Sequence, residues 1–294
     1  MIKTPTVFIL GAGASMPYGF PSGAELAAHI CQAGSDLQPF GVSQKENDEF
    51  VIELRNSGQS SVDAFLEHRP EFLHVGKVAI AYHLIQREDS LELLSRNRDW
   101  YTWLLNKMTV GTPFREFKNN RVFLITFNYD RSLEQFLFSR LCSLYGKSQE
   151  NVASALNDLP FVHLHGRMGY LPWQSKEEAK TRAYTAAIKP EAVAVAAEGI
   201  KVITENFDGS EELGQAQQLM KDAERIAILG FGYNVVNMAR LQVPLSKTVL
   251  GTCFGLTEAE KWHLTENLYR GLTLGSPQWQ ALQFVREQQA LQKD

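Results

Sequence analysis

The stretch Arg121–Asp130, RVFLITFNYD, decides the fold class of this chain. Its apolar run, Val122–Ile125, is typical of a strand that is buried on both faces of a parallel sheet. The run ends abruptly in a segment that carries Thr126, Asn128 and Asp130 at alternate positions. Open α/β sheets bind ligands at the carboxyl ends of their strands, so this segment predicts a binding site as well as a strand.

Four more apolar runs end in the same way, in glycine or in a reactive polar residue. They are Val7–Leu10 before Gly11-Ala-Gly-Ala-Ser15, Phe161–Leu164 before His165-Gly166, Ile226–Leu229 before Gly230-Phe-Gly-Tyr-Asn234, and Thr248–Leu250 before Gly251-Thr-Cys-Phe-Gly255. A single ending of this kind fits an ordinary turn. Five of them in one chain favour a nucleotide cleft at the edge of an α/β sheet.

Length and composition are those of a globular protein with a sizeable core. The chain has 294 residues, of which 44% are hydrophobic and 21% charged, and a net charge of −4. These values fit one large domain or a domain with an insertion. There is no lysine- or arginine-rich block, so we expect no direct binding of nucleic acid. The N-terminal apolar run is interrupted by Gly11 and is too short for a signal or a membrane span, so we expect no membrane association.

The three cysteines, Cys31, Cys142 and Cys253, lie far apart in the sequence. No CxxC pair exists, so the sequence indicates neither a zinc ribbon nor a disulfide framework. Lone cysteines in an enzyme-like chain fit a reducing compartment, and we therefore expect a cytoplasmic protein.

The order of these patterns predicts a Rossmann-like α/β fold, with a mainly parallel sheet flanked by helices and a small helical domain inserted into it. We assign residues 1–35 and 117–294 to the core and residues 36–116 to the helical insertion, within a single domain of residues 1–294. The predicted core helices are Gly23–Ala33 with Ser22 as its cap, Leu133–Tyr145, Ser210–Ala223, Thr257–Arg270 with a capping box at Thr257, and Gln278–Leu291. Lys176–Gly199 is rich in alanine and is predicted to be helical in part, with a break at Pro190.

Two glycine loops follow predicted strands. In Gly11–Ser15 the glycines let the backbone approach a diphosphate, and the N-terminus of a following helix favours its negative charge. Met16 replaces the third glycine of the usual dinucleotide fingerprint, and a plain tight turn explains the loop equally well. Gly230–Asn234 is explained almost as well by a hinge or turn. Both loops together with a polar strand end make a shared nucleotide site the simpler interpretation.

Asn128 and Asp130 are candidate site residues with different alternatives. An Asn side chain here can bond sugar hydroxyls or hold a water molecule, and an Asp can take an amide or orient a neighbour. Both residues are also suited to cap a helix that starts near Arg131, and for Asp130 this alternative has equal weight. Asn128 lies between Phe127 and Tyr129, and for it we favour the functional interpretation.

His163 and His165 alternate in the run Phe161–Gly166. Their spacing suits a metal, but no third ligand is near in the sequence, so we predict no metal site. We interpret His163 as a core or supporting histidine. His165 follows a strand directly and is the better candidate for a general base, because the ordinary pKa of histidine suits proton abstraction near neutrality.

Taken together, these motifs resemble those of the sirtuin superfamily in their order and spacing. The matching segments are Gly11-Ala-Gly-Ala-Ser15, Gly19-Phe-Pro21, Thr126-Phe-Asn-Tyr-Asp130, His165-Gly166 and Gly230-Phe-Gly-Tyr233. They are most similar to the sirtuin-like domains of bacterial anti-phage systems, and the resemblance covers residues 7 to about 255. Protein-deacetylating sirtuins carry a four-cysteine zinc module, which three scattered cysteines cannot build. Ser22-Gly23-Ala24 also stands where those enzymes usually have Asp-Phe-Arg. Both departures argue against an acyl-lysine groove.

The resemblance implies a role for each motif residue. Asn128 would hold the nicotinamide ribose and its attacking water, and His165 would act as a base on the ribose hydroxyls or the water. The implied cofactor-binding residues are Gly11, Ala12, Gly13 and Ser15 around the diphosphate, Pro21 and Thr126 in the flanking motifs, Asp130 toward the nicotinamide, and Gly230, Gly232 and Tyr233 toward the ribose and adenine. No metal ligand and no zinc are implied.

The implied function is an NAD glycohydrolase that cleaves NAD to nicotinamide and ADP-ribose, as an NAD-depleting effector of anti-phage defence. Such an activity needs control, and relatives pair with Argonaute proteins or helicase-type ATPases, so we expect a protein partner or a homo-oligomer. Two alternatives stay open. One is an NAD-dependent protein deacylase or ADP-ribosyltransferase, and the other is a non-catalytic module that senses NAD or ADP-ribose.

Overall fold

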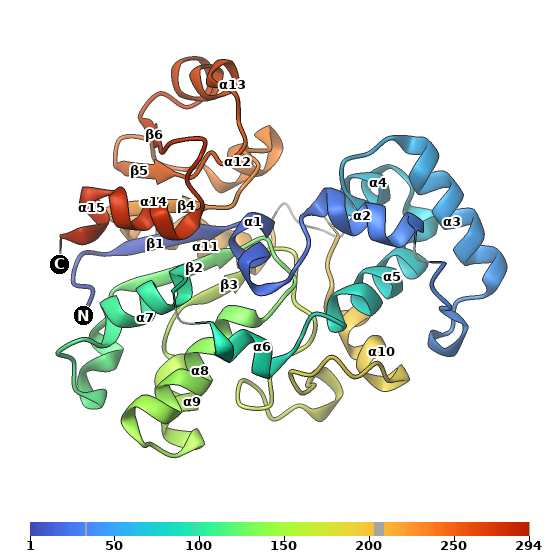
Figure 1. Cartoon of the computed structure of the whole chain (residues 1–294), viewed down its shortest axis with the longest axis horizontal. Coiled ribbons are helices and arrows are strands. Elements are labelled where there is room, and N and C mark those ends of the chain that lie inside the picture. Colours follow the sequence, from blue (N-terminus) through green and yellow to red (C-terminus); the bar gives the residue numbers. More distant parts are fainter. Residues whose placement is uncertain (33, 97, 203–208, 294) are drawn as a thin grey trace.

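A single parallel sheet organises the molecule. The structure, a computed structural model, describes residues 1–32, 34–96, 98–202 and 209–293. Within these residues, six strands lie in the order β3-β2-β1-β4-β5-β6, and all neighbouring pairs are parallel (Figure 1). The strands are β1 (Thr6–Leu10), β2 (Val122–Thr126), β3 (Phe161–His163), β4 (Arg225–Leu229), β5 (Thr248–Gly251) and β6 (Leu272–Leu274). The predicted Rossmann-like α/β fold with helices flanking the sheet is confirmed.

The strand order places β1 and β4 at the centre of the sheet. Phe8 of β1 pairs with Leu124 of β2 on one side and with Ala227 of β4 on the other. From β1 the chain builds outward through β2 and β3, and it then crosses back to build β4, β5 and β6 on the other side. The loops that follow β1 and β4 therefore meet at the point where the strand order reverses, which is where open α/β sheets bind their ligands.

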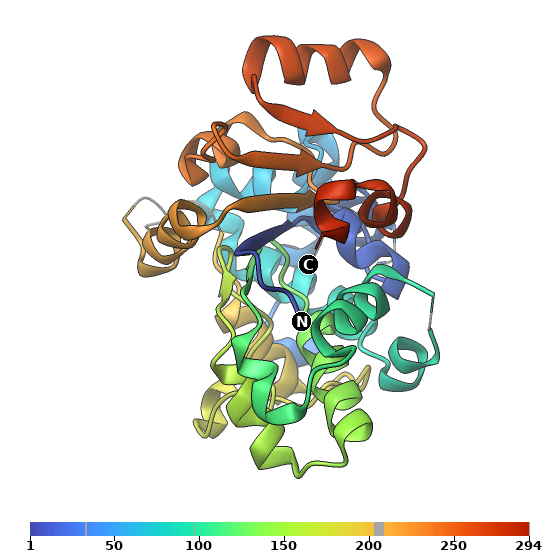
Figure 2. The same ribbon diagram turned by 90° about the vertical axis from the view of Figure 1, so that its left-hand side faces the viewer.

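Helices cover both faces of the sheet. Phe8 and Leu10 face one layer, and Val7 and Ile9 face the opposite layer, as the period of two in a strand requires. The first layer contains α7 (Trp100–Thr109), α8 (Ser132–Tyr145) and α14 (Ala281–Glu287), and the second contains α11 (Glu211–Asp222) and α12 (Val235–Leu241). Figure 2 shows the yellow-orange helix α11 on one side of the sheet and the teal, green and red helices on the other.

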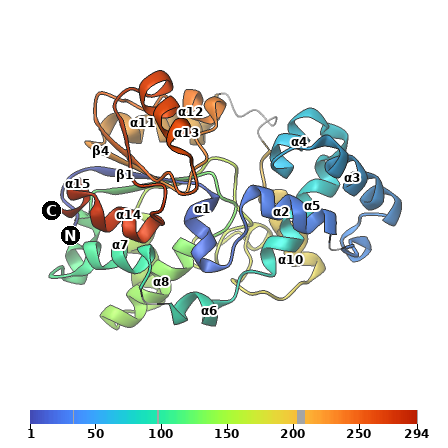
Figure 3. The same ribbon diagram turned by 45° about the horizontal axis from the view of Figure 1, so that its top comes forward.

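A helical lobe lies beside the sheet (Figures 1 and 3). Its helices are α2 (Gly23–Gln32), α3 (Gln44–Ser57), α4 (Val62–His68), α5 (Leu73–Ile85) and α10 (Pro190–Gly199), which pack on one another. α5 carries buried residues along nearly its whole length and needs cover on several sides, and α10 supplies Val193 and Ala196. A helix from a later part of the chain therefore completes the lobe.

This lobe differs from the predicted insertion of residues 36–116. It already begins at α2, and it ends at α5 before resuming at α10. By contrast, α6 (Ser90–Ser95) and α7 pack on α8 beside the sheet. The remaining helices are α1 (Ala12–Ser15), α9 (Gln149–Asn157), α13 (Glu258–Trp262) and α15 (Gln289–Gln292), with short 3₁₀ turns at Met16–Tyr18, Gln38–Phe40, Pro70–Phe72, Phe114–Asn119 and Glu178–Lys180.

The predicted helix starts are confirmed at the capped positions. Ser22 exchanges hydrogen bonds with Glu25 at the start of α2, and Thr257 forms the predicted capping box with Glu260 at the start of α13. Ser210 accepts a hydrogen bond at the start of α11. These three signals are local, because cap and partner lie within one turn of the chain. Ala33, the last residue of the first predicted helix, lies outside the described residues.

Four details of the prediction are wrong. The helix predicted over Gln278–Leu291 is two short helices, α14 and α15, and it begins only at Ala281. Pro190 was expected to break a helix, yet it begins α10, where its fixed φ fits and its missing N–H costs no hydrogen bond. The helix predicted over Thr257–Arg270 is α13 followed by the short π-helix His263–Leu268. β6 was not predicted, because a three-residue run is too short for a period to be seen. None of the helices in the described part of the chain has the length and apolar character that crossing a bilayer requires.

Candidate functional site

The loops that follow β1 and β4 touch each other through their backbones. The N–H of Gly11 donates to the carbonyl of Leu229 at 3.0 Å, and the N–H of Gly13 donates to the carbonyl of Gly230 at 2.9 Å. A Cβ atom on Gly13 would lie 2.8 Å from the Cα of Gly230. Gly230 has a φ of +60°, and a Cβ there would overlap the backbone nitrogen of Ala14. Packing between the loops therefore requires these glycines, whether or not a diphosphate approaches them.

A cavity of about 420 Å³ opens beside these two loops. Its walls include Gly13, Gly230, Gly232, Thr252, Phe254 and Trp279, and none of its lining residues is charged. The cavity thus lies at the reversal of strand order and offers apolar and aromatic surface with few polar groups. These properties suit a planar heterocycle such as a purine better than a group of high charge.

Several walls of this cavity were not assigned from the sequence. Thr252 and Phe254 lie in the run after β5 that was recognised as a strand ending, but neither was given a role. The hydroxyl of Thr252 accepts the N–H of Gly230 at 2.8 Å, so it also orders the loop after β4. Trp279 comes from the segment before α14, and no local pattern marks it as a cavity residue.

Asn128 joins the ends of β2 and β1. Its side-chain nitrogen donates to the carbonyl of Gly11 at 2.9 Å and lies 3.0 Å from the hydroxyl of Ser15. Its backbone N–H donates to the hydroxyl of Thr126 at 3.0 Å. The side chain is half-buried and does not cap α8. The functional interpretation of Asn128 is therefore compatible with its position beside the glycine loop.

Asp130 lies one residue before Arg131, the N-cap of α8, and its side chain bonds the first residue of that helix. It is buried, and its carboxylate accepts the N–H of Ser132 at 3.0 Å and the hydroxyl of the same residue. The phenol of Tyr101 lies 2.7 Å from that hydroxyl. Burial raises the pKa of Asp130, and hydrogen bonds from Ser132 and Ser15 oppose the shift. The carboxylate therefore orders the start of α8, in keeping with the alternative weighed for it.

His165 is enclosed by aromatic rings at the end of β3. Its ring centroid lies 5.2 Å from that of Phe127 and 6.2 Å from that of Tyr129. Burial lowers the pKa of His165 below its ordinary value of 6.5, and the charge of Asp63 opposes the shift. The ring is therefore neutral near pH 7, as a base must be. His165 is not among the residues that line the 420 Å³ cavity.

Helix α4 of the lobe covers the region of His165. The hydroxyl of Tyr129, at the end of β2, donates to the carboxylate of Asp63 in α4. Gly166 follows His165 with a φ of +70°, and a Cβ on it would overlap the carbonyl oxygen of Gly199 at the end of α10. The His-Gly pair thus includes a glycine that is needed for packing between the lobe and the sheet.

His163 is buried and contacts two acceptors. Its Nδ1 lies 3.1 Å from the carbonyl oxygen of Asn128, and its Nε2 lies 2.7 Å from Oε1 of Glu134 in α8. The two histidines therefore contact different partners. Among the described residues, no three His, Cys, Asp or Glu side chains gather as a metal site would require.

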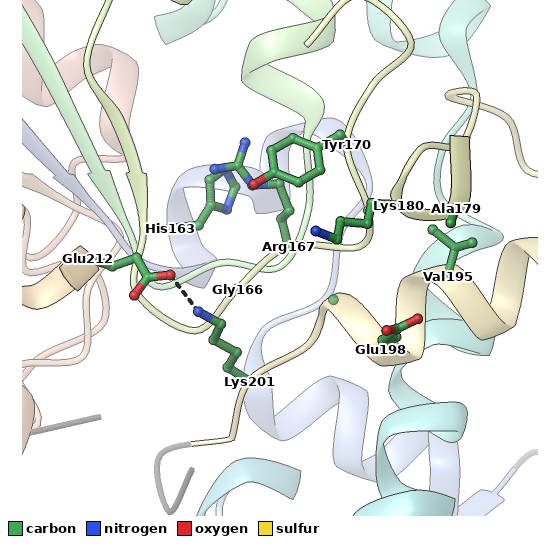
Figure 4. A pocket seen from close by; sticks show the side chains of 12 residues that line it. His163, Gly166, Arg167, Tyr170, Ala179, Lys180, Val195, Glu198, Lys201 and Glu212 are labelled. Carbon is green, nitrogen blue, oxygen red and sulfur yellow. Dashed lines mark hydrogen bonds and ion pairs between the residues drawn. The ribbon is translucent and has the colours of Figure 1, made fainter. Parts of the chain in front are cut away.

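A second cavity, of about 280 Å³, lies beside His163 between β3 and the lobe (Figure 4). Arg167, Lys180 and Lys201 line it from three separate segments, together with Glu198 and Glu212. Lys201 pairs with Glu212 at 2.5 Å across its lower part, and the guanidinium of Arg167 stacks 4.6 Å from the ring of Tyr170. These charges of both signs largely compensate one another, and the cavity has no clear preference for an anion.

The remaining predicted site residues are placed as follows. Ala12 and Ser15 belong to α1 in the loop after β1, and Pro21 lies half-buried just before α2. The hydroxyl of Tyr233 donates to the carbonyl of Thr252 at 2.7 Å, and the ring is buried. Tyr233 therefore ties the loop after β4 to the end of β5 and uses its polar atom inside the protein.

No protein-family model matches the chain, and no curated protein sequence matches it.

Proposed function

We propose that this protein is an NAD glycohydrolase that cleaves NAD to nicotinamide and ADP-ribose, without zinc. The single observation that carries the proposal is the uncharged 420 Å³ cavity at the reversal of strand order, with Asn128 anchored to the adjoining glycine loop. An adenosine half in this cavity would extend its diphosphate along Gly13 toward Asn128. The resemblance of the ordered motifs to sirtuin-like domains supports NAD as the nucleotide.

Cleavage of NAD requires the protein mainly to orient the reacting groups. Departure of nicotinamide leaves positive charge on the anomeric carbon of the ribose, so the site needs a fixed ribose, a placed water and a base. Asn128 would place the ribose and the water. His165, kept neutral by burial, would accept the proton as the water attacks. No step requires a metal.

Substrate access to His165 calls for movement of the lobe. The ring is buried, and the contact between Tyr129 and Asp63 holds α4 against the end of β2. An enzyme that depletes NAD needs a resting state, and a closed lobe would supply one. Control by a separate protein, such as a helicase-type ATPase or an Argonaute protein, or by self-association, belongs to this proposal.

Exposed apolar side chains in α12, after β5, in α13 and in the π-helix bear on such association. Val235, Val236, Phe254, Trp262 and Leu268 are each at least 40% exposed. Contiguous exposed apolar patches are typical of surfaces that contact other proteins. Light scattering of the purified chain would measure its oligomeric state. We also propose that the protein acts in the cytoplasm, in anti-phage defence.

The test is direct. Purified protein is incubated with NAD, and the products are separated and identified by mass spectrometry. We expect equal amounts of nicotinamide and ADP-ribose, with no requirement for an acetyl-lysine peptide. If the isolated chain is inactive, calorimetry with NAD and ADP-ribose still tests the cavity. Release of nicotinamide only in the presence of such a peptide would instead identify a deacylase.

A second candidate is a module that binds NAD or ADP-ribose without turning it over. The burial of His165 and the engagement of the Asn128 amide with Gly11 favour it, because both groups are occupied by the protein. Nucleotide binding with no product, in the presence of every partner tested, would support this candidate. Product formation that Asn128→Ala abolishes would exclude it.

A further inference from the structure

We propose that His163 is a positioning residue that is fixed by Glu134 and holds the Asn128 peptide in place. This inference rests on the proposed function, because it assigns a supporting role in the same site. It goes beyond a supporting core histidine by naming the atom that is held and the residue that fixes the ring. The argument starts from the backbone hydrogen bonds of the segment that follows β2.

The carbonyl groups of the segment after β2 accept hydrogen bonds from β3 and the residues that follow it. The carbonyl of Thr126 accepts the N–H of Leu164 at 2.9 Å, and the carbonyl of Tyr129 accepts the N–H of Met168 at 3.0 Å. Between them, the carbonyl oxygen of Asn128 lies 3.1 Å from Nδ1 of His163. A side-chain donor thus takes the place of a backbone amide at the residue that carries the candidate catalytic group.

Both ring nitrogens of His163 contact polar partners. A carbonyl oxygen only accepts, so Nδ1 carries the proton that it donates to Asn128. Nε2 lies 2.7 Å from Oε1 of Glu134 in α8. Burial raises the pKa of Glu134, but its contact with His163 outweighs this effect and lowers it. The ring is therefore fixed between the carbonyl of Asn128 and the carboxylate of Glu134.

Asn128 is consequently held at three points. Its backbone N–H is bound by Thr126, its carbonyl by His163, and its side-chain amide by Gly11 and Ser15. Loss of the carbonyl anchor would free the peptide to rotate, and the amide would leave the geometry that places ribose and water. A displacement of about 1 Å at a positioned group costs up to about a hundredfold in rate.

Two variants distinguish loss of the Glu134 charge from loss of the His163 donor. Glu134→Gln makes the pair neutral, yet a glutamine amide can donate to Nε2 while Nδ1 still donates to Asn128. Glu134→Gln with His163→Phe removes the donor, leaves no buried unpaired charge and keeps an aromatic ring. We expect Glu134→Gln to retain kcat within about threefold. We expect the double variant to lose about tenfold to a hundredfold in kcat with little change in KM.

A second readout does not depend on turnover. In protein labelled with ¹⁵N-asparagine, the side-chain amide of Asn128 gives an NMR signal that reports its hydrogen bonds to Gly11 and Ser15. We expect this signal to be preserved in Glu134→Gln and shifted in the folded double variant. In the wild-type protein, long-range ¹H–¹⁵N spectra should show Nδ1 of His163 protonated, since it faces the carbonyl oxygen of Asn128.

The outcomes are distinguishable. An unshifted Asn128 signal in the folded double variant overturns the positioning role, and so does a kcat equal to that of Glu134→Gln. An Nδ1 without a proton in the wild-type protein overturns the positioning role, even if the double variant does not fold. A shifted Asn128 signal in a protein that turns over no NAD under any condition supports the positioning role and counts against the proposed hydrolase alone.

Discussion

The backbone nitrogen of Gly13 donates to the carbonyl oxygen of Gly230, and the two residues lie so close that a Cβ on either would collide with the loop of the other. This contact joins the ends of the two central strands. It means that the glycines of both loops are constrained by the fold before any ligand is considered. Substitution of Gly13 therefore tests stability as well as binding.

We expect Gly230→Ala to destabilise the protein by more than about 2 kcal/mol, because its φ is positive and the new methyl group overlaps the backbone of Ala14. Urea denaturation measures the loss. Gly214→Ala is the matched control, since Gly214 is exposed in α11 with open space around its Cα, and alanine there should stabilise by about 0.5–1 kcal/mol. Equal effects of the two substitutions would contradict the packing argument.

Asn128→Ala and His165→Ala should each reduce NAD hydrolysis by about two to four orders of magnitude, through loss of a positioning group and of a base. NAD consumption under activating conditions, with thermal melts alongside, measures this. Asn106→Ala, at an exposed position of α7, is the control and should change neither quantity. The double variant should be little worse than either single variant, because both groups act on one transition state. Full activity in a folded His165→Ala protein would refute the assigned base.

The pH dependence of hydrolysis should reflect the burial of His165. Its pKa is lowered from 6.5, so the ring stays neutral, and able to accept a proton, as the pH falls below 6.5. We therefore expect the acid limb of kcat/KM to lie below pH 6.5, since the rate falls only when the ring becomes charged. Steady-state kinetics between pH 4.5 and 8 would show it. A limb at or above pH 6.5 would mean that another group limits the reaction.

His83 should make the lobe sensitive to acid. Burial, with smaller effects of His29 and Arg87, lowers the pKa of His83 from 6.5 to about 4. Between these values the unfolded chain binds the proton and the folded chain does not, so stability falls as the pH drops from 6.5 toward 4. The slope should stay below about 1.4 kcal/mol per pH unit, because solvent reaches part of the ring.

The measurement for His83 is chemical denaturation at several pH values. His83→Gln retains a partner for Ser35, whose hydroxyl lies 3.0 Å from Nε2 of the histidine, but cannot titrate. We expect a shallower fall of stability with acid in this variant. An unchanged slope would assign the acid sensitivity to other groups, such as His165, whose lowered pKa has the same sign of effect.

Tyr129→Phe should loosen the lobe, because it removes the hydroxyl that donates to Asp63 of α4. Hydrogen–deuterium exchange of α4 and of the peptide that contains His165 should become faster. If movement of the lobe limits access of NAD, kcat/KM should rise as well. Tyr145→Phe is the control, since its hydroxyl bonds the carbonyl of Thr112 at 2.8 Å, away from the lobe. Unchanged exchange in α4 would show that the contact does not hold the lobe closed.

The sequence predicted what is encoded locally and missed what depends on distant partners. The apolar runs and the caps at Ser22 and Thr257 lie within single elements, so five strands and several helix starts were predictable. The membership of α10 in the lobe was not, because the face that it covers on α5 lies more than a hundred residues earlier. Likewise, His165 follows a strand as expected, but its enclosure depends on Phe127 and on α4.

The candidate site shows the same limit. Gly13 and Gly230 were recognised from their loops, whereas their mutual contact joins residues more than two hundred positions apart. Trp279 reaches the cavity from a C-terminal segment with no pattern of its own. Asp130 was equally suited to a helix cap and to a site. Its bonds to Ser132, beside the N-cap Arg131, could not be read from the sequence.

The assembly of the lobe from two stretches of sequence has a mechanical consequence. In the described part of the chain, the backbone enters the lobe before α2, leaves after α5, enters again before α10 and leaves once more after it. Several tethers at one junction resist twisting far more than a single linker does. A protease that nicks one tether would leave fragments that still copurify, since α5 and α10 remain packed together. We therefore expect any opening of the lobe to be a small rotation, with the ends of a cut tether kept close by the packing of α5 on α10.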